Sequence, residues 1–573
     1  MKRNSAFFER SVTIAKRFLQ TAVVIDDRAF FNADGKPEPQ IIELSPPPTP
    51  TTAPIGDSSP TIPGPVAPVL ERPEELPMDP DPHGINARLI IESFAQQGIV
   101  CSVLRRTVGE DLTSPTDRAH LLFLIADILI VDWQVHNPNG SDSTEETLKF
   151  IKAAVGESLR DTPQKLRLIV IYTGASNLLE VATQVGLCLE TAANKPPRKD
   201  GDFAFQTDAL RVVVLGKPSN KRVQDQRDQQ VEDDSGLCTR TIEEFTEMTA
   251  GLVSNVALDS LAQVRRATHG LLTRFGPQLD AAFLTHRALL DPPSEGDEHL
   301  IPLIVSELEA ILENTVSISK DFLSEESIRQ WLDTRPNHLP SFDDSPQIDT
   351  EEKARKAVKE ICLTGVHEHE TYSVPNQPSW IKKLAKDKGN APIEKLTSLI
   401  AAENMTGADE KLEILMSFRT RYSNSLPMLT LGTLLQTNEG NQTHGYWLCL
   451  QPACDCFIRN DGPRRAFPLL RIEVVADKFN IVAEVGSAFV RLRWDAKPYK
   501  IQMFEFEANS QVETVIARSE NGTLLFSSIS PVKDFSWIAE LKFPQAQRVV
   551  QALASETARV GLTESEWIRR NAK

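Results

Sequence analysis

Four short apolar runs in the first part of the chain each end at a side chain that can take part in chemistry. The runs are rich in β-branched residues, which is typical of buried strands. Because the carboxyl ends of parallel strands lie at one edge of a sheet, the side chains that follow these runs would meet there. In chain order they belong to Asp26 and Asp27, to Asp132, to Thr173 and to Lys217.

This set suits the transfer of a phosphoryl group to a carboxylate. Asp132 would be the nucleophile and would form an aspartyl-phosphate. Attack by one anion on another needs neutralising charge, which a hard cation such as Mg²⁺ supplies while it bridges carboxylate and phosphoryl oxygens. The predicted ligands of this cation are Asp26, Asp27, Asp132 and the backbone carbonyl of Gln134.

Two more groups would contact the phosphoryl group. Lys217 would supply a point charge, and the hydroxyl of Thr173 would hydrogen-bond a phosphoryl oxygen. Neither GxGxxG nor GxxxxGK[ST] follows the first apolar run, which disfavours a nucleotide-binding domain.

Strands that alternate with helices would hold these residues in place. The alternation indicates an α/β fold with a doubly wound, five-stranded parallel sheet. The predicted strands cover residues 22–25, 99–104, 128–131, 166–172 and 212–215. The predicted helices cover residues 5–18, 85–97, 115–124, 143–157 and 176–189.

The residues around the strand ends resemble the four signature motifs of response-regulator receiver domains. The resemblance spans about residues 10–235 and implies a flavodoxin-like fold, phosphorylation by a histidine kinase and a switch that reorients Thr173. The four motifs, in the family's order, are Val24-Ile25-Asp26-Asp27, Ile130-Val131-Asp132-Trp133, Ile171-Tyr172-Thr173-Gly174 and Leu215-Gly216-Lys217-Pro218.

The chain departs from the receiver pattern in three places. Asp27 and Asp132 are about twice as far apart as is usual, because a Pro-rich insertion occupies about residues 34–84. The proline that commonly follows the acceptor is displaced to Pro138, and Val214 stands where the family often has an aromatic switch residue. The phosphorylation chemistry is expected to be intact, whereas these departures count against the standard signal relay.

Three further parts are predicted after a receiver-like domain at 1–235. They are a helical domain at 236–335, a linker with a second helical segment at 336–425, and a mixed, β-rich α+β domain at 426–573. The whole architecture, with the strings at 450–456 and 559–567, is similar to long bacterial response receiver proteins. That resemblance implies a histidine-kinase-like ATPase among its protein partners and a setting such as phage defence.

Composition narrows the class of protein. Asp and Glu total 79 against 62 Lys and Arg, and the net charge of −17 disfavours binding to nucleic acid or to an anionic membrane. No run approaches the ~20 apolar residues that span a bilayer. The seven cysteines, odd in number and mostly far apart, indicate reduced thiols in a cytoplasmic protein.

Weaker signals lie outside the receiver-like domain. Zinc at Cys449, Cys454 and Cys456, with His444 nearby, is disfavoured because Cys454-x-Cys456 is tighter than the usual spacing. Cys454 with His444 is a weak candidate for a thiol nucleophile. The string at 367–370, His-Glu-His-Glu, lacks the helical spacing of a zinc protease and indicates a solvated turn.

The predicted function is that of a two-component response regulator. It would accept a phosphoryl group on Asp132 from a phosphodonor, without further enzymatic activity, and relay the signal to a partner-binding C-terminal region. Two alternatives stay open: a pseudo-receiver scaffold that is never phosphorylated, and an enzyme whose active site lies in the C-terminal region.

Overall fold

The chain forms two compact units. The first is Arg10–Ala250, and the second comprises Gly251–Lys573 together with Met1–Glu9. Residues 34–83 of the predicted insertion, Pro138 and the string at 367–370 lie outside the described residues. The computed structural model describes residues 3, 5–31, 84–105, 118–136, 142–159, 166–192, 197–207, 209–218, 230–290, 293, 295–334, 359–360, 362–365, 397, 400, 407–422, 425–438, 444–456, 462–509, 514–558 and 569–570.

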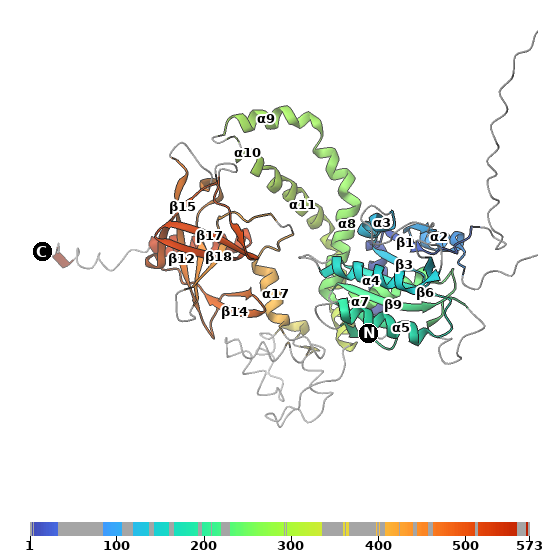
Figure 1. The fold of residues 1–573 in the computed structure, drawn as a ribbon. Coiled ribbons are helices and arrows are strands. Elements are labelled where there is room, and N and C mark those ends of the chain that lie inside the picture. Colours follow the sequence, from blue (N-terminus) through green and yellow to red (C-terminus); the bar gives the residue numbers. More distant parts are fainter. Residues whose placement is uncertain are drawn as a thin grey trace, which may run out of the picture. The chain divides into compact units, whose positions relative to one another are not determined.

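A seven-stranded sheet forms the centre of the first unit (Figure 1). Five of its strands run parallel to their neighbours, in the order β2-β1-β3-β6-β9. This arrangement confirms the predicted doubly wound sheet. The five strands are β1 (Thr21–Ile25), β2 (Val100–Leu104), β3 (Ile128–Val131), β6 (Arg167–Thr173) and β9 (Leu210–Gly216).

Two short antiparallel strands extend the sheet beyond β9. Strand β8 (Ala204–Gln206) pairs with β9, and β7 (Arg198–Lys199) pairs with β8. A separate antiparallel pair, β4 (Val135–His136) and β5 (Asp142–Ser143), follows β3. The sequence gives no periodic signal for strands of two or three residues, so none of these was predicted.

Helices cover both faces of the sheet. One core joins inward-facing strand residues such as Val23, Val131 and Val214 to helices α3 (Arg118–Ile125), α4 (Thr144–Leu159) and α5 (Leu178–Ala192). Helices α2 (Ala87–Gln96) and α7 (Leu237–Thr249) pack against the sheet and against each other. Phe18, the last residue of α1 (Ala6–Phe18), stacks on Phe245 of α7 with ring centroids 6.0 Å apart.

The helical middle region that the sequence predicts is present. Helices α8 and α11 pack on each other, with Arg274 Nε 3.6 Å from Glu307 Oε2. In the described residues, no helix is long and apolar enough to span a membrane. The elements are α8 (Leu252–Arg274), η2 (Pro277–Leu279), α9 (Asp280–Ala288), α10 (Glu295–Glu298), α11 (Leu300–Phe322), α12 (Glu325–Asp333) and α17 (Ala408–Ser417).

The C-terminal domain is an antiparallel sheet that closes on itself. Strands follow the order β11-β10-β18-β17-β15-β12, and a further pairing of β11 with β12 completes the ring. Hairpin β13–β14 continues from β12, β16 pairs with β17, and helix α18 follows the last strand. The elements are β10 (Thr433–Asn438), β11 (His444–Cys449), η3 (Ala453–Asp455), β12 (Arg464–Val474), β13 (Ile481–Val485), β14 (Ala488–Arg493), η4 (Pro498–Lys500), β15 (Ile501–Glu507), β16 (Arg518–Glu520), β17 (Thr523–Ser530), β18 (Val532–Glu540) and α18 (Phe543–Thr557).

Alternate residues of the closed sheet fill two separate cores. One is aromatic: Phe504 lies 5.3 Å from Trp447 and 5.0 Å from Phe535 between ring centroids, both edge to face. The other contains the adjacent residues Leu434 and Leu448 and is covered by α18. Because the ring is closed, its strands have no free edges. Two cores and the backbone hydrogen bonds between the strands hold this domain together.

Candidate functional site

The strand register brings the predicted reactive residues to one edge. Ile25 pairs with Val131, Val131 with Ile171, and Ile171 with Val214, so these strands end at nearly the same level. The side chains beyond them lie together at the carboxyl edge and are at most 5 % exposed. They are those of Asp26, Asp27, Asp132, Thr173 and Lys217.

Lys217 is the centre of this group. Its Nζ lies 2.7 Å from Asp26 Oδ2 and 3.3 Å from Asp132 Oδ2. Burial by itself would lower the pKa of this ammonium, but the two carboxylates raise it above its ordinary value. Lys217 is therefore charged at neutral pH and joins residues that are far apart in the sequence.

Asp132 has a strongly perturbed carboxyl group. Burial raises its pKa to about 7; Lys217 opposes the rise and Asp26 adds to it. Its Oδ1 accepts a hydrogen bond of 2.8 Å from the backbone N–H of Trp133, and its carbonyl accepts one of 3.0 Å from the Thr147 hydroxyl. The side chain is thus fixed at the end of β3, with Oδ2 on the side of Lys217.

Backbone N–H groups orient the side chains of two more predicted residues, Asp26 and Thr173. Asp26 Oδ1 accepts the backbone N–H of Arg28 at 2.8 Å, which orients its other oxygen toward Lys217. Thr173 Oγ1 accepts the N–H of Ala175 at 3.1 Å, and the Thr173 carbonyl accepts the N–H of Lys217 at 2.8 Å. Gln134, whose carbonyl was predicted to ligate the metal, lies two residues beyond Asp132 with its side chain exposed.

The donor chemistry fits a hard divalent cation. When ionised, Asp26, Asp27 and Asp132 carry three negative charges against one positive charge on Lys217 within this group of four side chains. Across the described residues, however, no three His, Cys, Asp or Glu side chains already stand in positions that would hold a metal ion. Lys217 holds Asp26 and Asp132 in this arrangement.

The cysteines of the C-terminal domain are placed as core residues. Cys449 and Cys456 are fully buried, and burial raises the pKa of the Cys449 thiol far above its ordinary value. Cys456 Sγ lies 3.2 Å from the carbonyl oxygen of Pro452. His444 is exposed, and the side chain of Cys454 lies outside the described residues. Both thiols belong to the aromatic core of the closed sheet, where a buried cysteine behaves as a small apolar residue.

Sequence reasoning missed a polar cluster next to the site. The hydroxyl of Tyr172 lies 2.9 Å from the carbonyl oxygen of Glu232 and 3.1 Å from Asp234 Oδ1. Asp234 Oδ2 accepts the backbone N–H of Asn86 at 2.7 Å. The available signal was an acidic run, 232–234, which in isolation predicts only a solvated turn.

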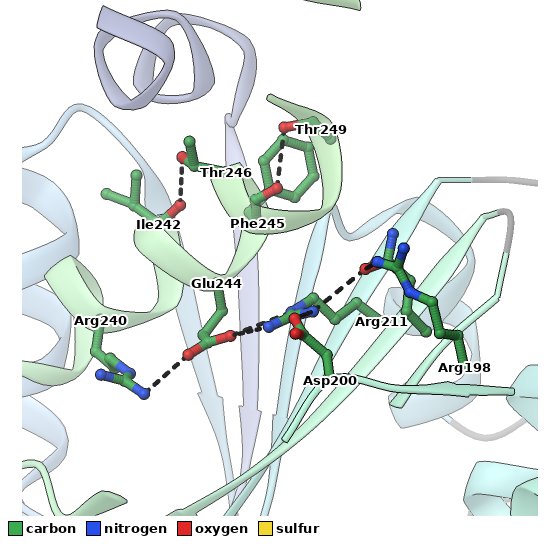
Figure 2. Close-up of polar contacts among 10 residues, drawn as sticks. Arg198, Asp200, Arg211, Arg240, Ile242, Glu244, Phe245, Thr246 and Thr249 are labelled. Carbon is green, nitrogen blue, oxygen red and sulfur yellow. Dashed lines mark hydrogen bonds and ion pairs between the residues drawn. The ribbon is translucent and has the colours of Figure 1, made fainter. Parts of the chain in front are cut away.

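A buried ion-pair network fixes α7 to the extended edge of the sheet (Figure 2). Arg211 of β9 donates to Glu244 of α7 from Nε at 3.1 Å and from Nη2 at 2.8 Å, and its Nη1 lies 2.7 Å from Asp200. Arg240 Nη2 lies 2.9 Å from the other carboxylate oxygen of Glu244. The helix that follows β9 is therefore part of the same unit as the site.

Comparison with known families supports the motif assignment. The model of the response receiver domain family matches residues 18–222, which include all four motifs at the carboxyl edge. Comparison with curated proteins and with solved structures gave no match. The parallel strand order, the acidic edge and the family match agree, and residues 18–222 of this chain are a response receiver domain.

Proposed function

We propose that this chain is a signalling protein of the two-component type that accepts a phosphoryl group on Asp132. The observation that carries the proposal is the placement of Lys217, whose ammonium lies between the buried carboxylates of Asp26 and Asp132. An ammonium so placed would offset the charge that gathers when a phosphoryl group meets a carboxylate.

In the proposed step, a carboxylate oxygen of Asp132 forms a bond to phosphorus while the bond from phosphorus to the donor's leaving group breaks. The electron pair of the broken bond stays with the leaving group, so charge and atoms balance. Lys217 would contact the transferred oxygens. The hydroxyl of Thr173, whose Oγ1 accepts the N–H of Ala175, would donate a hydrogen bond to a phosphoryl oxygen.

Mg²⁺ is part of this proposal. Asp26, Asp27, Asp132 and the backbone carbonyl of Gln134 would hold it, and when bound it supplies the positive charge that Lys217 alone does not provide. The raised pKa of Asp132 reflects burial and the neighbouring charge of Asp26. Added positive charge would favour the ionised, nucleophilic form of this carboxyl.

The proposed phosphodonor is a histidine-kinase-like ATPase, and residues 236–573 would contact protein partners. Both inferences rest on the resemblance to long response receiver proteins. A change in the contacts of Thr173 and Lys217 on phosphorylation would bias the receiver between two arrangements.

The test is the binding of beryllofluoride, a phosphoryl mimic, to the full chain with and without Mg²⁺. We expect Mg²⁺-dependent binding that Asp132→Asn abolishes. Asp127→Asn is the matched control, because Asp127 and Asp132 are equally buried, at 5 % exposure each. Asp127 lies immediately before β3, and Asp132 lies immediately after it. A wild-type chain that does not bind the mimic would favour the pseudo-receiver scaffold instead.

A further inference from the structure

A polar cluster lies next to the proposed acceptor site. It consists of Tyr172, Asp234 and Asn86. Tyr172 precedes Thr173 in β6 and is 1 % exposed. Its neighbours Glu232 and Asp234 come from the segment that returns to the sheet after β9, where Val231 bridges to Gly216 and the N–H of Glu232 donates to the Gly216 carbonyl at 3.0 Å. The segment is therefore seated on the residue that precedes Lys217.

Burial shifts the pKa of both titratable groups in this cluster. Burial raises the pKa of Tyr172, and the charge of Asp234 raises it further, so the hydroxyl keeps its proton and acts as a donor. Burial also raises the pKa of Asp234, against the hydrogen bonds from Asn86 and Tyr172 and the charge of Lys217. Burial of the Asp234 carboxyl group is unfavourable, and hydrogen bonds from Tyr172 in β6 and from Asn86 at the start of α2 offset that cost.

One end of the cluster contacts the acceptor site. The Nζ of Lys217 lies 5.7 Å from the centroid of the Tyr172 ring, within the range of a cation–π interaction. Lys217 also attracts the Asp234 carboxylate through space. The ammonium thus interacts with Tyr172 and Asp234 as well, while its ion pairs with Asp26 and Asp132 hold it in place.

The other end of the cluster holds the stem of the long insertion. Phe30 bridges to Asn86; its N–H donates to the carbonyl of Ile85 at 3.0 Å, and its carbonyl accepts the N–H of Ala87 at 2.8 Å. These four residues are where the chain departs before the insertion and returns after it. Asn86 is also the N-cap of α2, its side chain accepting the N–H of Leu89.

We propose that Asp234 is a positioning residue that, through Tyr172, couples the Lys217 ammonium to the stem formed by Phe30, Ile85, Asn86 and Ala87. This inference rests on the proposed phosphoryl site. A phosphoryl group on Asp132 draws the ammonium toward itself and away from the Tyr172 ring. The hydrogen bonds from Tyr172 and from the Asn86 N–H to Asp234 then loosen, so that the stem senses the phosphorylation state.

The test is amide hydrogen–deuterium exchange of the full chain, free and with Mg²⁺ and beryllofluoride, in peptides that cover residues 84–89. In the wild type we expect exchange there to become faster by on the order of fivefold with the mimic bound. Tyr172→Phe keeps the ring and removes the hydroxyl, and Asp234→Asn removes the charge. Both variants should bind the mimic and lose the change at the stem.

Asp233→Asn is the matched control. Asp233 accepts the N–H groups of Ser235 and Gly236, at 3.0 and 2.7 Å, and asparagine keeps an acceptor for them, so the response should be retained. A stem response that persists in both test variants overturns the coupling. So does a wild type that binds the mimic without any change at 84–89, which leaves the proposed function standing. A wild type that does not bind overturns both proposals. Tyr172→Phe decides the matter if Asp234→Asn does not fold.

Discussion

The carboxyl group of Asp132 is held under opposing influences. Its burial and the nearby charge of Asp26 favour the neutral acid, whereas Lys217 and the Trp133 N–H favour the carboxylate, and the result is a pKa of about 7. The proposed role of Asp132 as a nucleophile needs the ionised form. The receiver is therefore sensitive, at this one residue, to any cation that arrives beside it.

The first prediction concerns pH and stability without divalent metal. The folded-state pKa of Asp132, about 7, lies above the ordinary value of 3.8. The free energy of unfolding is therefore highest below pH 3.8, where this carboxyl is neutral in both states, and it falls as the pH rises through 7. Asp132→Asn lacks this loss. In EDTA, we expect the variant to gain about 1–3 kcal/mol over the wild type between pH 4 and pH 8.

Urea unfolding at the two pH values measures this gain, with the receiver followed by hydrogen exchange in peptides from β3 and β6. Asp127→Asn, at the other end of β3, provides the comparison: Asp127 Oδ2 accepts N–H groups of Gln20 and Thr21, and asparagine keeps an acceptor for them. A difference between Asp132→Asn and wild type that does not grow with pH would contradict the proposed state of Asp132.

Among the elements, α7 shows how the receiver is completed beyond the residues that match the family model. Glu244 and Arg211 are 1 % and 2 % exposed and form a two-point ion pair between α7 and β9. A buried pair of this kind contributes little compared with apolar residues, but the loss of one partner is costly because the other charge stays buried.

The second prediction follows from that asymmetry. Glu244→Ala should destabilise the receiver by about 3–5 kcal/mol, since Arg211 and Arg240 both lose a carboxylate. The double variant Arg211→Met, Glu244→Leu should recover most of that loss. Urea unfolding measures both, with Glu190→Ala on the exposed face of α5 as the control. Equal destabilisation by Glu244→Ala and Glu190→Ala would show that the network does not hold α7.

Sequence patterns predicted the elements that are long and apolar. The strands that carry Asp26, Asp132, Thr173 and Lys217 are buried runs, so both their existence and their edge were predictable. The helices predicted at 5–18 and 143–157 are observed as α1 and α4 within one or two residues of those bounds, since their apolar positions recur at helical spacing.

Other features depend on contacts between distant residues and left no local signal. Strands β7 and β8 are too short to show a period, and the pairing of β11 with β12 that closes the C-terminal sheet joins segments by tertiary geometry alone. Asp234 is polar and follows a stretch without apolar pattern, yet it contacts Tyr172, 62 positions earlier. Such residues acquire their role only when the chain folds.

At the scale of the whole molecule, the two compact units have separate cores. The core around Val23, Val131 and Val214 belongs to Arg10–Ala250, and the two cores of the closed sheet belong to Gly251–Lys573. The first unit continues past residue 235, where the sequence placed its boundary, and takes in α7.

The third prediction is that residues 1–250 fold by themselves and bind beryllofluoride with the Mg²⁺ dependence of the full chain. All residues of the proposed acceptor site and the helices of their unit lie within that fragment. A fragment of residues 1–235, which lacks α7, leaves Arg211 without Glu244 and should unfold at a lower urea concentration. Circular dichroism and binding measurements on the two fragments check this. Equal stability of the two would contradict the assignment of α7.

The hairpin beyond β9 has a consequence for solubility. A parallel sheet that ended at β9 would offer seven residues of apolar strand as a template for another chain. Instead, the last strand on that side is β7, which has two residues, Arg198 and Lys199, both exposed and both cationic. Copies of the protein that approach through this edge meet like charges and few unpaired backbone groups, which protects the receiver against aggregation.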